Sequence, residues 1–159
     1  MAEVVATVAV GANLGNAQAN VAQAMQALGD LPQTRLLHGS SLYRSPAFQT
    51  NGPDYVNAVA QVATTLTAPA LLQALQQLEL AAGRERPYRW APRTLDLDLI
   101  FYGQASVQSP DLTLPHPRWQ ERAFVVTPLA ELGSDRVTPA LLATLADQPI
   151  ERITAPNVL

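Results

Sequence analysis

Leu95-Asp96-Leu97-Asp98-Leu99-Ile100 is the stretch of the sequence that decides the fold. Hydrophobic and acidic residues alternate in it, and alternate side chains of a β-strand point to opposite faces of the sheet. We therefore expect a strand from Leu95 to Tyr102 whose leucines face a core. The carboxylates of Asp96 and Asp98 then share the opposite face, with backbone positions about 6–7 Å apart.

This pair of carboxylates is a candidate metal site. Two like charges so close together repel each other unless a cation lies between them, and Mg²⁺ prefers oxygen ligands. Paired metal ions in such sites lie about 3.5–4 Å apart. The alternative is an amphipathic edge strand with a solvated acidic face, and the alternating pattern alone favours that alternative.

Arginines gather directly before the acidic strand. The chain has ten arginines and no lysine, and Arg84, Arg86, Arg89 and Arg93 lie in one proline-broken segment with Trp90. Guanidinium groups bind phosphate oxygens through paired hydrogen bonds, and a loop of this kind can close over a ligand. Because the chain has no lysine, a P-loop is excluded. The alternative is a solvated loop in which arginine replaces lysine.

Periodicity along the rest of the chain predicts the order strand, helix, strand, strand, helix, strand. The strands are expected at 4–10, 34–43, 55–64 and 95–102. The helices are expected between the caps Asn16 and Gly29 and between Thr67 and Gly83. This order is typical of an α+β protein with a ferredoxin-like βαββαβ core, in which helices cover one face of an antiparallel sheet. A short helix at 139–145 belongs to C-terminal additions.

Length, charge and composition exclude several classes of function. The chain has 159 residues, a net charge of −3 and no cysteine. Its length fits one domain spanning 1–159, and the lack of cysteine excludes disulfides and a cysteine nucleophile. An acidic protein is a poor general binder of nucleic acid, and no apolar run is long enough to cross a bilayer. We expect a cytoplasmic monomer with small-molecule substrates and without nucleic-acid or membrane partners.

One known family shares these features. The run Arg89-Trp-Ala-Pro-Arg-Thr-Leu-Asp-Leu-Asp-Leu-Ile100 closely resembles the signature of the 6-hydroxymethyl-7,8-dihydropterin pyrophosphokinases. Further matching motifs follow the family's order: Gly11-Ala-Asn-Leu14, Ser41-Leu-Tyr-Arg-Ser-Pro46, Pro53-Asp-Tyr-Val-Asn57, Leu114-Pro-His-Pro117 and Arg122-Ala-Phe124. The resemblance covers nearly the whole chain. It implies an enzyme of folate biosynthesis that transfers diphosphate from Mg-ATP to 6-hydroxymethyl-7,8-dihydropterin and releases AMP.

The resemblance also implies roles for individual residues. Asp96 and Asp98 would hold two Mg²⁺ ions, and Arg84 and Arg93 would stabilise charge on the phosphates. The implied ATP contacts are Gln76, Glu79, Arg86, Trp90, Leu99, Thr113, His116 and Arg122. The implied pterin contacts are Ser45, Pro46, Ala47, Phe48, Tyr55, Asn57 and Phe124. Because the arginine segment is one residue shorter than in some relatives, Arg86 and Arg89 are alternatives for one role.

Two details of this assignment follow from spacing. Gln76 and Glu79 lie one turn apart, so we expect them on the same face of their helix. Tyr55 and Asn57 alternate with Val56, so we expect them on the same face of their strand, which agrees with a shared pterin pocket.

Two rival functions have the same expected topology. A regulatory ligand-binding domain would not need an acidic strand beside an arginine segment. An RNA-binding module would carry aromatic residues on its central strands and a basic face, and residues 4–10 have neither. In the favoured interpretation the pterin hydroxymethyl oxygen attacks the β-phosphorus of ATP, and the arginine segment with Trp90 closes over the bound substrates.

Overall fold

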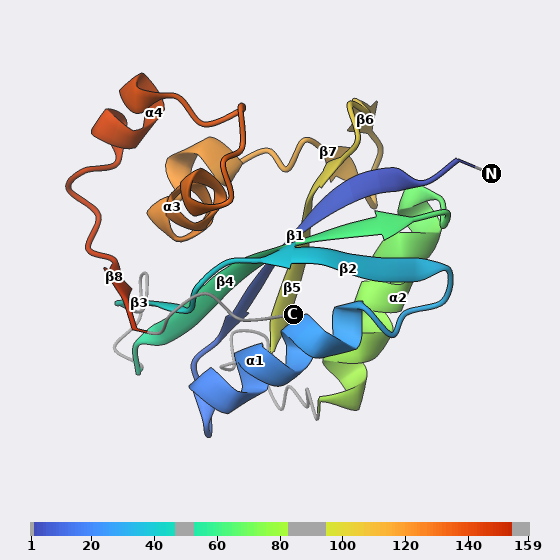
Figure 1. The fold of residues 1–159 in the computed structure, drawn as a ribbon, viewed down its shortest axis with the longest axis horizontal. Coiled ribbons are helices and arrows are strands. Elements are labelled where there is room, and N and C mark those ends of the chain that lie inside the picture. The colour runs from blue at the N-terminus through green and yellow to red at the C-terminus, as the bar shows by residue number, and fades with distance from the viewer. Residues whose placement is uncertain (1, 47–52, 83–94, 154–159) are drawn as a thin grey trace.

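The computed structural model describes residues 2–46, 53–82 and 95–153 (Figure 1). In that part of the chain the strands are β1 Val4–Ala12, β2 Thr34–Gly39, β3 Tyr43–Ser45, β4 Tyr55–Thr64, β5 Asp96–Tyr102, β6 Val107–Gln108, β7 Thr113–Leu114 and β8 Glu151–Arg152. The helices are α1 Ala17–Leu28, α2 Ala68–Ala81, the 3-10 helix η1 Trp119–Glu121, α3 Ala123–Glu131 and α4 Pro139–Thr144. No helix of this described part is long and apolar enough to cross a membrane.

The main sheet is antiparallel and is built around β1. This strand pairs with β4 on one side and with β5 on the other. In turn, β4 pairs with β2 and with β3, and β3 also pairs with β8. The order is therefore β5-β1-β4-β3-β8, with β2 beside β4. The expected combination of helices with an antiparallel sheet is confirmed.

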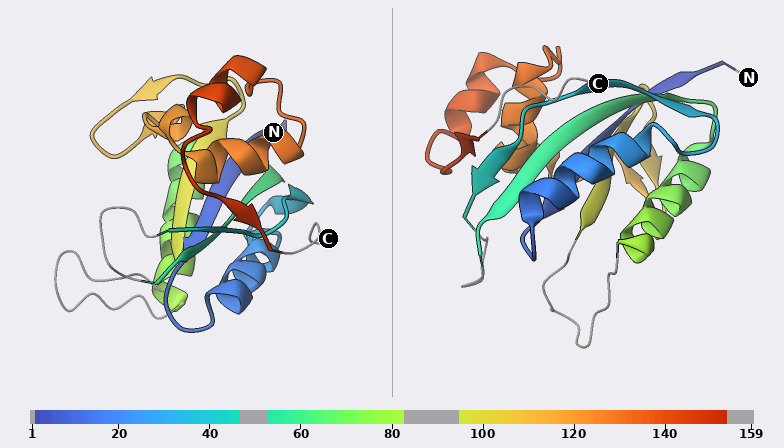
Figure 2. Two further views of the ribbon diagram at one scale, coloured as in Figure 1. Left: turned by 90° about the vertical axis from the view of Figure 1, so that its left-hand side faces the viewer. Right: turned by 60° about the horizontal axis from the view of Figure 1, so that its bottom comes forward.

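The first face of the sheet is covered by α1 and α2 (Figure 2). The buried residues of α1 recur at helical spacing, and they are Val21, Ala24, Met25 and Leu28. Asn16 caps α1 by accepting a hydrogen bond from the Ala19 amide, and Thr67 caps α2 by accepting one from the Ala70 amide. Both predicted helix starts are confirmed.

The second face of the sheet is partly covered by α3. Val126 and Leu129 of α3 belong to one apolar cluster with Val59 of β4 and Ile100 of β5. The two helices predicted for the core, α1 and α2, do lie on one face, whereas α3, which the sequence analysis did not predict, lies on the other. Since β4 and β5 carry apolar side chains on both faces, the second face also needs a cover to exclude water.

Residues 34–45 form two strands in place of the single strand expected at 34–43. The break coincides with Ser40, whose hydroxyl bonds to the backbone. Its Oγ donates to the Ser41 carbonyl (2.8 Å) and accepts from the Val59 amide (2.9 Å). The Val59 amide of β4 thus bonds to a side-chain hydroxyl in place of a backbone carbonyl, and β3 pairs with β4 in a register shifted from that of β2.

Glu131, at the end of α3, ties this break to the second face of the sheet. Its carboxylate accepts hydrogen bonds from the Ser41 amide (3.0 Å), the Ser41 hydroxyl (2.9 Å) and the Tyr43 hydroxyl (2.5 Å). Burial and the bond to Glu131 raise the pKa of Tyr43 to about 12. Burial alone would raise the pKa of Glu131. Hydrogen bonds from Tyr43 and Ser41, with the charge of Arg152, hold it below its usual value.

Replacing this carboxylate by an amide tests the network. Glu131→Gln turns an N–H donor toward Ser41 or Tyr43, so we expect the free energy of unfolding to fall by about 1–3 kcal/mol near neutral pH. Because the folded-state pKa of Glu131 is lowered, its stabilisation is present above the usual value of 4.5 and is lost as pH falls through the folded pKa. Urea denaturation from about pH 7 to about pH 3.5 should therefore show the wild-type advantage shrinking on acidification.

The matched control is Asp135→Asn, which neutralises an exposed carboxylate a few residues away. A difference between wild type and Glu131→Gln that stays constant across this pH range would contradict the proposed contribution of the carboxylate charge.

Candidate active site

The two carboxylates of β5 lie on the second face of the sheet, as the alternation predicts. Leu95, Leu97 and Leu99 are buried in the cluster under α1 and α2. Asp96 and Asp98 are partly exposed on the opposite side of the strand. The register of β1 places Gly11 opposite Asp96 of β5 and also opposite Asn57 of β4, so Asp96 and Asn57 lie on either side of one glycine, and Asp98 is opposite Ala9.

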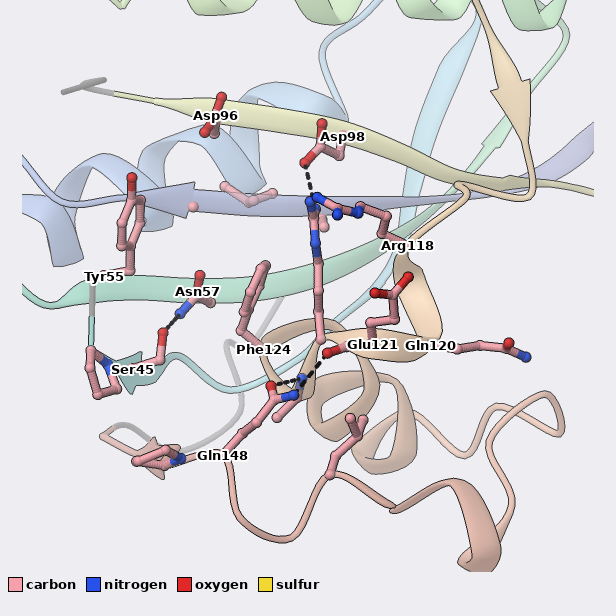
Figure 3. Close-up of a pocket in the computed structure, with 18 of the residues that line it drawn as sticks. Ser45, Tyr55, Asn57, Asp96, Asp98, Arg118, Gln120, Glu121, Phe124 and Gln148 are labelled. Carbon is pink, nitrogen blue, oxygen red and sulfur yellow. Dashed lines mark hydrogen bonds and ion pairs between the residues drawn. The ribbon is translucent and has the colours of Figure 1, made fainter. Parts of the chain in front are cut away.

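A pocket of about 960 Å³ opens over this part of the sheet (Figure 3). Its lining includes eight residues of the sequence-based site: Ser45, Pro46, Tyr55, Asn57, Asp96, Asp98, Arg122 and Phe124. Residues to which the sequence analysis assigned no role also line it, among them Gly11, Arg118, Gln120, Glu121, Asp147 and Gln148. Strands β1, β4 and β5 thus form the floor of the pocket. Residues between 118 and 149 form the opposite wall.

One end of the pocket presents an oriented amide and aromatic rings. Asn57 and Ser45 are both buried, and Asn57 Nδ2 donates to Ser45 Oγ (2.8 Å), which fixes the amide. Tyr55 and Phe124 line the same space from β4 and α3 (Figure 3). A Cβ atom on Gly11 would lie 3.3 Å from Asn57 Oδ1 and 4.0 Å from Tyr55 Cδ1, so the glycine keeps the floor open.

The other end of the pocket is charged. Arg122 Nη1 lies 3.9 Å from Asp98 Oδ2, and the Arg122 guanidinium also lies 5.5 Å from the centre of the Phe124 ring. Arg118 also lines the pocket and lies near Asp98 (Figure 3). The Asp98 side chain is 45% exposed, so it remains accessible to a ligand despite this ion pair.

His116 adds a neutral donor close to these charges. Its Nδ1 accepts a hydrogen bond from the Arg118 amide (3.1 Å), which assigns the proton of the neutral ring to Nε2. Burial lowers the pKa of His116, the charge of Asp98 opposes that shift, and the charges of Arg122 and Arg118 reinforce it. His116 does not line the pocket itself but borders its charged end.

Gln76 and Glu79, the two nucleotide contacts predicted on α2, differ in burial. Gln76 is exposed on α2, whereas Glu79 is 5% exposed and its Oε2 accepts a hydrogen bond from the Leu97 amide (2.8 Å). Glu79 is therefore buried against β5, while Gln76, one turn away on the same helix, is exposed. The burial of Glu79 has a physical reason. Strand β5 is an edge strand of the sheet, so the amides on its outer edge need an acceptor from another element.

The remaining predicted residues divide into two groups. Leu99 is buried under α1 and α2 and Thr113 lies in β7, and neither side chain lines the pocket. Six predicted residues lie outside the described part of the chain, and they are Ala47, Phe48, Arg84, Arg86, Trp90 and Arg93. Arg89 and the predicted closure of the arginine segment also lie outside it.

The donor set of the acidic pair fits magnesium. The described residues contain no group of three metal-ligating side chains. Magnesium is usually held by one or two carboxylates together with substrate phosphates, so Asp96 and Asp98 satisfy that requirement without a third protein ligand.

Carboxylates, arginines and an oriented amide that share one pocket are the features of an enzyme that transfers a phosphate-containing group. Residues 7–134 match the family model of 7,8-dihydro-6-hydroxymethylpterin-pyrophosphokinase (HPPK), and the chain belongs to this family.

Relatives with similar sequences carry the corresponding name. Proteins called 2-amino-4-hydroxy-6-hydroxymethyldihydropteridine pyrophosphokinase are 43% identical in Pseudomonas aeruginosa, over 92% of this chain and 94% of that protein, and 42% identical in Haemophilus influenzae, over 86% of each. The resemblance seen in the sequence motifs is thereby confirmed.

Solved structures show the same fold in distant relatives. An HPPK-DHPS crystallised with substrates has a TM-score of 0.63 at 9% identity over 83% of this chain. HPPK-DHPS from Plasmodium falciparum has a TM-score of 0.58 at 10% identity over 81% of this chain. The chain spans only 40% and 39% of those two longer proteins.

The position of Glu79 leads to a prediction about stability. Glu79→Ala leaves the Leu97 amide without its acceptor beside a buried strand, so we expect the free energy of unfolding to fall by about 1–3 kcal/mol. Glu79→Gln keeps an acceptor and should retain most of the stability. As the control, Gln76→Ala alters an exposed side chain on the same helix and should change stability by less than about 0.5 kcal/mol. Equal urea midpoints for Glu79→Ala and Gln76→Ala would contradict the assigned hydrogen bond.

Proposed function

We propose that this chain transfers diphosphate from ATP to 6-hydroxymethyl-7,8-dihydropterin and releases AMP, as a step of folate biosynthesis. Membership of the HPPK family supports this proposal, and so do the names of relatives that cover most of the chain. The observation that carries it is the pocket that contains the acidic pair and in which Asn57 and Asp96 flank Gly11. One substrate can then lie over β4 and the other over β5.

The end of the pocket over β4 suits the pterin. Tyr55 and Phe124 supply aromatic surface for a flat heterocycle, and Asn57 offers an amide to the polar edge of the ring. The bond between Asn57 and Ser45 orients that amide before the ligand arrives. Pro46 completes this wall, and the resemblance adds Ala47 and Phe48 to the same subsite.

The end of the pocket over β5 suits the triphosphate of ATP. We propose that Asp96 and Asp98 hold two Mg²⁺ ions, which neutralise charge on the phosphates when bound. Arg122 and the Nε2–H of His116 are donors for phosphate oxygens at the same end. The family resemblance adds Arg84 and Arg93 as further phosphate partners. It also adds Gln76, Arg86, Trp90 and backbone groups near Leu99 and Thr113 as nucleotide contacts.

The reaction is a displacement at the β-phosphorus. The pterin hydroxymethyl oxygen forms a bond to this phosphorus, the bond from phosphorus to the oxygen that bridges to the α-phosphate breaks, and AMP leaves with that oxygen. The alcohol proton passes to water or to a carboxylate such as that of Asp96. Transfer of this kind depends on alignment and charge stabilisation more than on a covalent role for the protein.

The finer architecture is part of the proposal. The order β5-β1-β4-β2, with α1 following β1 and α2 following β4, supports a ferredoxin-like core with C-terminal additions. We propose that residues 1–159 form one domain that works as a cytoplasmic monomer on small molecules, without nucleic-acid or membrane partners. Neither rival function, a regulatory domain or an RNA-binding module, explains why an acidic pair and an oriented amide line the same pocket.

Product analysis tests the proposed bond cleavage. With Mg-ATP and 6-hydroxymethyl-7,8-dihydropterin, we expect AMP to form in one-to-one proportion with the pterin consumed, because the attack is at the β-phosphorus. Chromatography of the nucleotides measures this, with a reaction lacking pterin as the control for ATP hydrolysis. ADP as the stoichiometric product would show attack at the γ-phosphorus and would refute diphosphate transfer.

A further inference from the structure

The start of α3 lacks a capping side chain of its own. Arg122 occupies the N-cap position, and its side chain makes no capping hydrogen bond. Arginine has no acceptor atom, so it cannot satisfy the first amide groups of a helix, which have no partner within the helix itself. An acceptor for these amides must come from elsewhere.

Gln148 supplies the missing acceptor from the far end of the chain (Figure 3). Its Oε1 accepts a hydrogen bond from the Ala123 amide (2.9 Å), and its Nε2 donates one to the Glu121 carbonyl (2.8 Å). The two bonded groups stand on either side of Arg122. One side-chain amide therefore holds the backbone both before and after this arginine.

The segment that carries Gln148 is itself anchored. Leu145 is buried in the apolar cluster on the second face of the sheet, and Ile150 packs against the same cluster. Gln148 lies between these two anchors and beyond residues 7–134, which match the family model. The packing of Leu145 and Ile150 thus fixes the position of Gln148 beside Arg122.

The two hydrogen bonds of Gln148 act at the junction between η1 and α3, where the chain changes direction. Arg122 has an extended backbone (φ −121°, ψ 108°) between η1 and α3, and rotation at this junction would swing its side chain. In the held geometry its guanidinium lies 3.9 Å from Asp98 and over the Phe124 ring. Fixing the two neighbouring peptide groups therefore fixes where both Arg122 and Phe124 enter the pocket.

We propose that Gln148 is a positioning residue that acts through Arg122: its side-chain amide clamps the η1–α3 junction and directs the guanidinium toward the nucleotide phosphates. The inference rests on the role proposed above for Arg122 in ATP binding. It concerns orientation of the arginine and assigns Gln148 no contact with either substrate.

A double-mutant cycle on nucleotide affinity tests the proposal. The probe is α,β-methylene-ATP with Mg²⁺, measured by calorimetry, and the variants are Gln148→Leu, Arg122→Met and both together. We expect Gln148→Leu alone to raise Kd roughly tenfold, and to have little further effect once Arg122 has been replaced. Gln148→Glu keeps the acceptor for Ala123 but loses the donor to Glu121, so it should give an intermediate Kd and serves if the leucine variant does not fold.

The control is Thr138→Ala, which removes the capping bond to the Leu141 amide at the start of α4; neither of these two residues lines the pocket. It loosens the same C-terminal region, so its Tm should fall while Kd stays unchanged. An unchanged Kd in Gln148→Leu, or an equal loss of affinity with and without Arg122, would overturn the clamp while leaving the proposed function intact. If Arg122→Met alone binds the nucleotide normally, the proposed role of Arg122 is wrong and the inference falls with it.

Discussion

The pairing of Gly11 with both Asn57 and Asp96 is the constraint on which the site depends. Adjacent strands lie about 4.8 Å apart, so the backbones of Asn57 and Asp96 are separated by about two strand spacings across one residue without a side chain. Register also decides the face. A slip of one residue along β5 would turn the carboxylates into the apolar layer under α1 and α2 and would turn the leucines toward the pocket.

The second face shows how the remainder of the chain completes this arrangement. Helix α3 covers the apolar half of that face and leaves the polar half open as a pocket. Two side-chain contacts hold the helix at its ends: Gln148 binds the backbone at its start, and Glu131 bonds to the break between β2 and β3 from its end. The wall of the pocket is thus fixed by contacts between segments that are far apart in the sequence.

Local patterns made much of the structure predictable. Alternation along β5 is enough to place the leucines and aspartates, and Asn16 and Thr67 mark the helix starts because capping depends on neighbouring residues. The partner of Glu79 lies 18 residues away and that of Glu131 lies 90 residues away, so neither contact has a local signature. The contacts of Gln148 have no local signature either, since a single glutamine in the run Asp147-Gln148-Pro149 indicates no particular partner.

Paramagnetic line broadening tests most directly whether the acidic pair forms the nucleotide end of this pocket. Mn²⁺, which prefers the same oxygen ligands as Mg²⁺, would be added with α,β-methylene-ATP to ¹⁵N-labelled protein. We predict that broadening is strongest for the amides of β5 near Leu97 and for Gly11, is weak along α1, and largely disappears in an Asp96→Asn, Asp98→Asn double variant. Broadening centred on the face covered by α1 and α2, or unchanged in the double variant, would contradict the account.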